Sequence, residues 1–179
     1  EARIDLAAPL SAAALEQLFA GQIVREEHFG WEQACGAVVA RRVRRLGAIV
    51  LDEQLLPVAD DERAVLAMLQ GVRQIGLDAL PWDPECRGLQ ARAQFVRGLA
   101  RPDLAAWPAS DEATLLAELP QWLGPYLGGI TRRTALTRVP LREALWARWF
   151  GAQRRALETL APRELKVPSG SSLRIDYLD

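Results

Sequence analysis

The spacing of apolar residues changes at Pro57, and this change limits what the chain can fold into more than any other feature. Between residues 23 and 56, aromatic and β-branched residues alternate with polar ones, and residues 33–36 and 46–47 have turn composition. A period of two is typical of strands, so three antiparallel strands are predicted here. After Asp60-Asp61 the apolar residues recur every three or four positions, which is typical of amphipathic helices. The sequence therefore predicts an α+β fold.

The boundaries follow the same signals. Residues 1–58 are predicted to be an antiparallel β module with one short helix, residues 59–165 a helical domain, and residues 166–179 a turn and a strand. A weak alternation predicts a further strand over residues 1–8, and the short helix is expected to start at Ser11, its N-cap, and to stop at Gly21. The later helix starts are expected at Asp60 or Asp61, Pro84, Ser110, Pro140 and Ala152, and the last strand at Leu173–Tyr177.

Composition excludes several classes of protein. The chain has 179 residues, of which 50% are apolar, and a net charge of −1, so one or two compact domains can form without disulfide or metal support. No apolar run approaches the ~20 residues that span a bilayer, and no signal peptide is recognised. Cys35 and Cys86 are far apart and belong to no CxxC pair, so a cytoplasmic location is expected. Lys166 is the sole lysine and does not follow glycine, which excludes a Walker A loop.

The side chains offer little catalytic chemistry. His28 is the single histidine, so a histidine-rich metal site is excluded, and a nucleophile–histidine arrangement would have to use it. The paired carboxylates are best explained as helix caps and solvated faces. We therefore expect no catalytic residue, no metal and no cofactor in this chain. A self-contained enzyme remains an alternative only if His28 lies in a cleft beside a buried acid.

Four arginines, Arg41, Arg42, Arg44 and Arg45, lie within five residues of a predicted strand. Alternation puts Arg41 and Arg45 on one face and Arg42 and Arg44 on the other. One interpretation is contact with a nucleic-acid backbone. The other is a solvated edge strand whose charges prevent aggregation. Trp31 and Phe29, which precede the arginines on a predicted strand, are candidates for a base-stacking platform.

Other features support these alternatives less strongly. The remaining tryptophans are expected to lock the packing of the helices. Residues 1–120 carry a balance of −6 and residues 121–179 a balance of +5, which suggests a basic surface in the C-terminal third. The pairs Arg132-Arg133 and Arg154-Arg155 are weaker candidates for phosphate contact.

A set of short motifs, taken together, resembles one family. They are Gly36-Ala37-Val38-Val39-Ala40-Arg41-Arg42, Arg45-Leu46-Gly47-Ala48, Leu80-Pro81-Trp82, Leu89-Gln90-x-Arg92 with Phe95, Trp107-Pro108, Ser110-Asp111-Glu112 with Leu115-Leu116, Trp122-Leu123-x-Pro125-Tyr126-Leu127, Leu160-Ala161-Pro162, Val167-Pro168-Ser169-Gly170-Ser171 and Ile175-Asp176-Tyr177. Their order and spacing resemble the region after the motor domains in the HrpB family of bacterial DExH-box ATP-dependent helicases. Lys166 departs from the threonine that is usual at this point in the family.

This resemblance implies a fragment of a longer protein. It would begin inside an OB-like module, here partial, and continue into a helical extension. ATP and Mg would be cofactors of the full-length protein, bound by motor domains of the same chain, and no motor residue has a counterpart here. In related helicases the OB-like module lines the exit channel for a single strand, which favours Arg41 to Arg45 as contacts for single-stranded RNA or DNA.

Two functions are therefore expected to compete. In the first, the chain is an accessory region that helps to guide single-stranded nucleic acid while ATP is hydrolysed elsewhere. In the second, it is a structural or protein-interaction module that braces the helicase or docks a partner, without direct contact to nucleic acid. The net charge of −1 favours the second, because autonomous nucleic-acid binders are usually basic. No membrane partner is expected.

Overall fold

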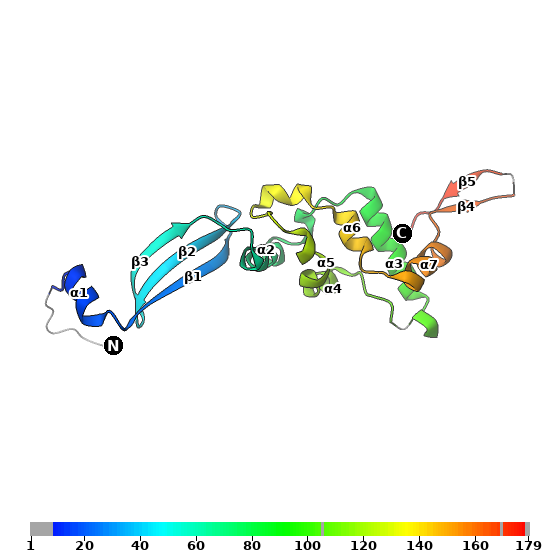
Figure 1. The fold of residues 1–179 in the computed structure, drawn as a ribbon. Coiled ribbons are helices and arrows are strands. Elements are labelled where there is room, and N and C mark those ends of the chain that lie inside the picture. The colour runs from blue at the N-terminus through cyan, green and yellow to red at the C-terminus, as the bar shows by residue number, and fades with distance from the viewer. Residues whose placement is uncertain (1–8, 105, 169, 178–179) are drawn as a thin grey trace, which may run out of the picture. The chain divides into compact units, whose positions relative to one another are not determined.

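The computed structural model describes residues 9–104, 106–168 and 170–177, and its elements are drawn in Figure 1. The strands are β1 (Ile23–Glu32), β2 (Ala37–Leu46), β3 (Ile49–Leu56), β4 (Glu164–Lys166) and β5 (Ser172–Arg174). The α-helices are α1 (Ala12–Phe19), α2 (Glu62–Ile75), α3 (Pro84–Gly98), α4 (Glu112–Ala117), α5 (Leu119–Trp122), α6 (Leu141–Trp146) and α7 (Gly151–Leu160). The 3₁₀ helices are η1 (Leu77–Ala79), η2 (Pro102–Leu104), η3 (Gly124–Tyr126) and η4 (Arg133–Arg138).

Strands β1, β2 and β3 form one sheet in that order, with β2 and β3 antiparallel. Both predicted turns are present, and Gly36 and Gly47 adopt φ values of 59° and 57°, a left-handed conformation that glycine adopts without steric cost. The pairing of β2 with β3 shifts between Arg44 and Arg45, which leaves Leu51 without an opposing residue. Such a bulge bends a strand and increases its twist.

The contacts divide the chain into two units. The sheet unit contains the residues up to Phe29 together with Val39–Val58, and the helical unit contains Gly30–Val38 and Ala59–Asp179. The tip of the β1–β2 hairpin thus belongs with the helices. It is held there by backbone bonds: the Val38 N–H donates to the Thr131 carbonyl at 2.8 Å, and the Arg133 N–H donates to the Gly36 carbonyl at 2.8 Å.

Aspartates begin the main helices. Asp61 starts α2, Asp83 starts α3 and Asp111 starts α4, and each side chain accepts hydrogen bonds from backbone N–H groups of the first turn. Pro84 lies in the first turn of α3, as predicted. The prediction that Ser110 caps α4 is wrong. Ser110 is 2% exposed, and its backbone carbonyl accepts from the amides of Gln90 and Gln94, so the cap falls one residue later.

The helical unit holds most of the buried apolar side chains. Trp149 and five leucines of α4 to α7 are almost completely buried: Leu115, Leu119, Leu141, Leu145 and Leu157. Three indole N–H groups donate to carbonyls: Trp82 to Leu77, Trp107 to Ala93 and Trp122 to Leu115. A buried indole N–H usually has a partner, and these bonds fix the orientation of the three rings. Packing is thus the role the structure gives these tryptophans.

The end of the described chain is fastened to α3. Arg92, only 4% exposed, donates from Nε to the Ala161 carbonyl at 2.6 Å and forms an ion pair with Glu158 at 3.1 Å. Strands β4 and β5 form an antiparallel hairpin. After it, the Tyr177 hydroxyl donates to the Pro162 carbonyl at 2.9 Å, and the Tyr177 ring meets Phe95 edge-on with centroids 5.2 Å apart.

The α+β fold class is confirmed by this arrangement. The final strand is shorter than predicted and ends at Arg174, because its antiparallel partner β4 is only three residues long. Helix α1 begins after Ser11, as expected, and ends at Phe19, just before the predicted stop. The strand predicted over residues 1–8 lies outside the described residues. None of the helices in the described part of the chain combines the length and apolarity needed to cross a membrane.

Candidate nucleic-acid interface

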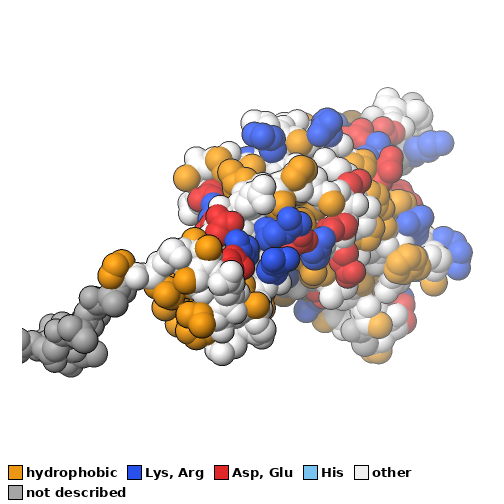
Figure 2. Space-filling model, turned by 60° about the vertical axis from the view of Figure 1, so that its left-hand side comes forward, with side chains coloured by type: hydrophobic (Ala, Val, Ile, Leu, Met, Phe, Trp, Pro, Cys, Tyr) orange, Lys and Arg blue, Asp and Glu red, His pale blue; other side chains and the backbone are white. Residues whose placement is uncertain are grey.

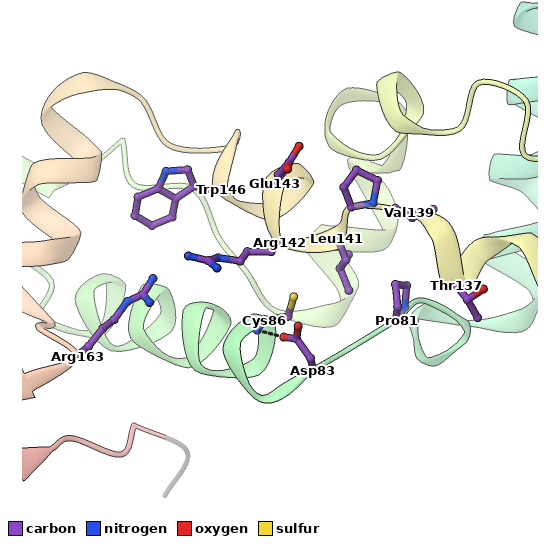
Figure 3. A pocket seen from close by; sticks show the side chains of 11 residues that line it. Pro81, Asp83, Cys86, Thr137, Val139, Leu141, Arg142, Glu143, Trp146 and Arg163 are labelled. Carbon is purple, nitrogen blue, oxygen red and sulfur yellow. Dashed lines mark hydrogen bonds between the residues drawn. The ribbon is translucent and has the colours of Figure 1, made fainter.

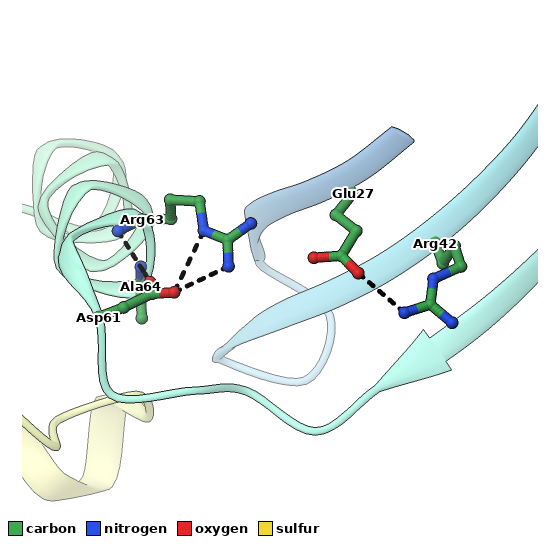
Figure 4. Close-up of polar contacts among 5 residues, drawn as sticks. All are labelled: Glu27, Arg42, Asp61, Arg63 and Ala64. Atoms are coloured by element: carbon green, nitrogen blue, oxygen red, sulfur yellow. Dashed lines mark hydrogen bonds and ion pairs between the residues drawn. The ribbon is translucent and has the colours of Figure 1, made fainter. Parts of the chain in front are cut away.

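Three of the four clustered arginines of β2 form ion pairs within the sheet unit. Arg41 pairs with Glu53 of β3 at 3.2 Å, Arg42 pairs with Glu27 of β1 at 2.9 Å, and Arg44 pairs with Glu16 of α1. Figure 4 shows the pair of Glu27 and Arg42 and, separately, the cap that Asp61 forms with Arg63 and Ala64. These carboxylates balance much of the positive charge that the sequence places on β2.

The arginines are nevertheless accessible to different degrees. The side chains of Arg41 and Arg42 are 39% and 46% exposed, whereas that of Arg44 is 27% exposed. Arg45 is half-buried, and its Nε atom, like that of Arg44, is buried without a hydrogen-bond partner. Arg41 and Arg42 are therefore the members of the cluster that a ligand can reach most easily.

Trp31 belongs to the hairpin tip and packs on α2. A Cβ atom added to Gly71 would lie 2.4 Å from the Trp31 ring, so the indole rests directly on the helix backbone. Its Nε1 atom is buried without a hydrogen-bond partner. This position gives Trp31 a packing role and leaves the face against α2 closed to a base.

His28 lies at the surface of β1. Its Nε2 atom is 3.1 Å from Glu26 Oε2, and the two side chains are 56% and 43% exposed. The acid beside His28 in the described part of the chain is therefore exposed and not buried. No group of three His, Cys, Asp or Glu side chains suited to a metal ion occurs among the residues that the structure describes.

A cavity of about 590 Å³ opens beside α6, in the helical unit. Pro81, Val139 and Leu141 form apolar walls, and Figure 3 shows the guanidinium groups of Arg142 and Arg163 directed toward the space below Trp146. The sequence did not predict that Arg142, Arg163 and Trp146 lie together. The one signal pointing to them is the basic balance of residues 121–179.

Two groups at the base of this cavity, Asp83 and Cys86, are not activated for catalysis. Asp83 accepts the Cys86 N–H at 2.6 Å, and this bond holds the pKa of the Asp83 carboxyl below its usual value, so it stays ionised. Burial raises the pKa of the Cys86 thiol to about 11, so the thiol stays protonated at neutral pH. The cavity thus offers charges and apolar walls, without an activated nucleophile.

Basic and acidic side chains lie beside one another on one face of the molecule (Figure 2). On the face drawn in Figure 2, blue Lys and Arg side chains lie beside red Asp and Glu side chains, with one compact blue group near the middle. This distribution agrees with the net charge of −1.

Comparison with known proteins identifies the family. Residues 122–179 match a family described as the ATP-dependent helicase C-terminal region, HrpB_C, and residues 22–56 match the connector region of the ATP-dependent RNA helicase HrpB. The chain is an HrpB-like helicase C-terminal region. The resemblance of the sequence motifs to HrpB is thereby confirmed.

Individual relatives agree. The chain is 29% identical to the ATP-dependent RNA helicase HrpB of Escherichia coli, over 99% of this chain and 22% of that protein. A crystal structure of the E. coli DExH-box NTPase HrpB matches 94% of this chain and 21% of that chain, with a TM-score of 0.65 and 27% identity. A crystal structure of the Escherichia coli DEAH/RHA helicase HrpB matches 87% of this chain and 20% of that chain, with a TM-score of 0.63 and 28% identity. The chain thus spans about a fifth of its relatives' length.

Proposed function

We propose that this chain is an accessory region of an ATP-dependent RNA helicase and that it contacts single-stranded RNA through β2. ATP and Mg would be bound by motor domains elsewhere in the parent protein. The observation that supports the contact is the exposure of the Arg41 and Arg42 guanidinium groups, 39% and 46%, at the surface of the sheet. The E. coli relative is described as an RNA helicase, which favours RNA over DNA.

The ion pairs on β2 do not prevent such a contact. A solvent-exposed pair contributes only about 0–1 kcal/mol, whereas an RNA phosphate offers arginine a bidentate, charge-assisted partner. Glu27 and Glu53 would then hold the guanidinium groups in place until a phosphate replaces them. On this proposal the carboxylates compete with RNA, and that competition can be measured.

The first test is therefore to remove the competing carboxylates. We expect Glu27→Gln and Glu53→Gln to tighten binding of a labelled single-stranded RNA by about two- to fivefold at ~50 mM salt, measured by fluorescence anisotropy, and the gain to shrink at ~200 mM salt. Arg41→Gln with Arg42→Gln should weaken binding. Glu62→Gln, which removes one negative charge from the first turn of α2, is the matched control and should leave the affinity within about twofold.

A second function is favoured by a different observation. Several apolar side chains of the sheet unit are exposed, among them Leu18, Ile49 and Leu55 at 67%, 64% and 68%. A contiguous patch formed by such side chains would be typical of a protein–protein contact, and a module that braces the helicase or docks a partner would need one. If the folded chain binds no RNA at ~50 mM salt and the glutamate variants change nothing, the proposal of RNA contact through β2 fails and this second function replaces it.

A further inference from the structure

The cavity beside α6 brings together two cations and one aromatic ring. Arg142 extends from α6 and Arg163 from the segment before β4, and Figure 3 shows their guanidinium groups pointing toward one another below the Trp146 indole. Two cations directed at one space repel each other unless an anion lies between them. The arrangement is therefore suited to a negatively charged ligand.

The charges around the two arginines leave room for that anion. Arg142 pairs with Glu85 at 2.7 Å, and both side chains are more than half exposed, at 57% and 51%. Arg163 is exposed and has no ion-pair partner among the described residues. Two carboxylates, Asp83 and Glu143, also line the cavity, and that of Asp83 accepts the backbone N–H of Cys86 at the start of α3. Arg163 is thus the cation of this cavity that no described carboxylate pairs with.

Trp146 adds a planar surface. The guanidinium carbon of Arg154 lies 5.4 Å from the ring centroid, and Trp149 meets the ring edge-on at 6.4 Å. These contacts fix the orientation of the indole while it still lines the cavity. Because every nucleobase has a π-face, a fixed aromatic ring beside cations is a general solution for binding single strands.

We propose that this cavity binds one nucleotide of a single-stranded nucleic acid, with the base against Trp146 and the phosphate between Arg142 and Arg163. The volume of about 590 Å³ lies within the usual range for small-molecule sites. The apolar walls formed by Pro81, Val139 and Leu141 exclude water around the base. This inference rests on the proposed contact with single-stranded RNA and adds a second, separate place for it.

The test uses the whole chain and a labelled oligouridylate of about eight nucleotides. Arg142→Gln and Arg163→Gln should each weaken binding by about five- to tenfold, because each removes one charged phosphate contact. Arg73→Gln is the matched control, since Arg73 is exposed, lies in the last turn of α2 and does not line the cavity; the affinity of this variant should change by less than about twofold. Circular dichroism melts show whether each variant is folded.

A cross-linking measurement makes the site visible independently of affinity. An oligonucleotide with 4-thiouridine, irradiated in the complex, should attach to the peptide that contains Trp146, and the yield should fall in Arg163→Gln. If the Arg142 and Arg163 variants bind like the parent chain while Arg41→Gln with Arg42→Gln loses binding, the cavity site is wrong and the β2 proposal stands. If the folded parent chain binds no oligonucleotide, both are wrong.

A competition experiment tests whether the cavity binds an acidic peptide instead of a nucleotide. An acidic peptide that contains a tryptophan carries negative charge and an aromatic ring without phosphate. Competition of this peptide with the oligonucleotide in an Arg163-dependent manner, at lower concentration than free uridine monophosphate, would overturn the nucleotide assignment and identify the cavity as a peptide site. Competition by uridine monophosphate alone supports the nucleotide assignment.

Discussion

At the scale of single residues, the contact between Trp31 and Gly71 has the clearest consequence. Position 71 lies in the middle of α2, where alanine is ordinarily about 1 kcal/mol better than glycine. Here a Cβ would lie 2.4 Å from the indole, and overpacking of this kind costs about 1–3 kcal/mol. Glycine is thus required by the neighbouring ring, in spite of its poor helix propensity.

We therefore expect Gly71→Ala to lower the free energy of unfolding by about 1–2 kcal/mol in urea denaturation. Gly88→Ala, in α3, is the matched control, because a Cβ at that position would meet nothing within 4 Å. It should raise the free energy of unfolding by about 0.5–1 kcal/mol. Equal changes in the two variants would show that Trp31 does not press on α2.

The residues of the candidate site were only partly predictable for a physical reason. Arg41 and Arg42 could be found in the sequence because they are adjacent on one strand. Their carboxylate partners could not, since Glu27 and Glu53 lie on the two neighbouring strands and the pairing depends on register. Arg142 and Arg163 come together only through the packing of α6 beside the chain that follows α7.

At the scale of elements, local chemistry predicted where the helices start, but in one case it placed the start one residue away from the observed position. Residues 110–112 offer a serine and two acids in succession, each able to accept from the first turn. Tertiary contacts decide between them, because Gln90 and Gln94 of α3 bind the Ser110 carbonyl. Ser110 is therefore buried, and Asp111 is the N-cap of α4. The strands and turns of residues 23–56 depend on closer neighbours, and their pattern predicted them correctly.

The caps also make stability depend on pH. Hydrogen bonds from the N–H and hydroxyl of Thr114 hold the pKa of Asp111 below its usual value of 3.8. The ionised form is thus favoured in the folded state, so its contribution is present above that pH and is lost as pH falls through the lowered value.

We expect Asp111→Asn to cost about 0.3–1 kcal/mol at pH 7, where the lost charge interacted with the helix dipole. The difference from the parent chain should vanish in acid, once Asp111 is itself protonated. Urea midpoints measured from neutral pH down to about pH 2 test this. Glu112→Gln removes a charge from the same turn without removing the cap, and it should change the midpoint less. A cost that is the same at every pH would contradict the assignment.

At the scale of the whole molecule, the two units differ in how much apolar surface they bury. In the sheet unit, the described apolar side chains that are buried are those of Ala40 and Val43. The helical unit buries Trp107, Trp122 and Trp149 together with a long set of leucines. Because burial of apolar area is the main favourable term in folding, the sheet unit should open at a lower free energy than the helical unit.

Native-state hydrogen exchange measures this difference directly. Amides of α3 and α6 should exchange only through global unfolding, whereas those of β3 should exchange through a smaller opening with little dependence on urea. The hairpin tip is the informative case, since the Val38 N–H bonds Thr131 of the helical unit. The Val38 amide should therefore exchange through the same opening as the amides of the helices and not through the opening of the rest of β2. If Val38 exchanges with β3, the tip is part of the sheet unit in solution, and the anchoring of Trp31 on α2 does not survive the opening of the sheet.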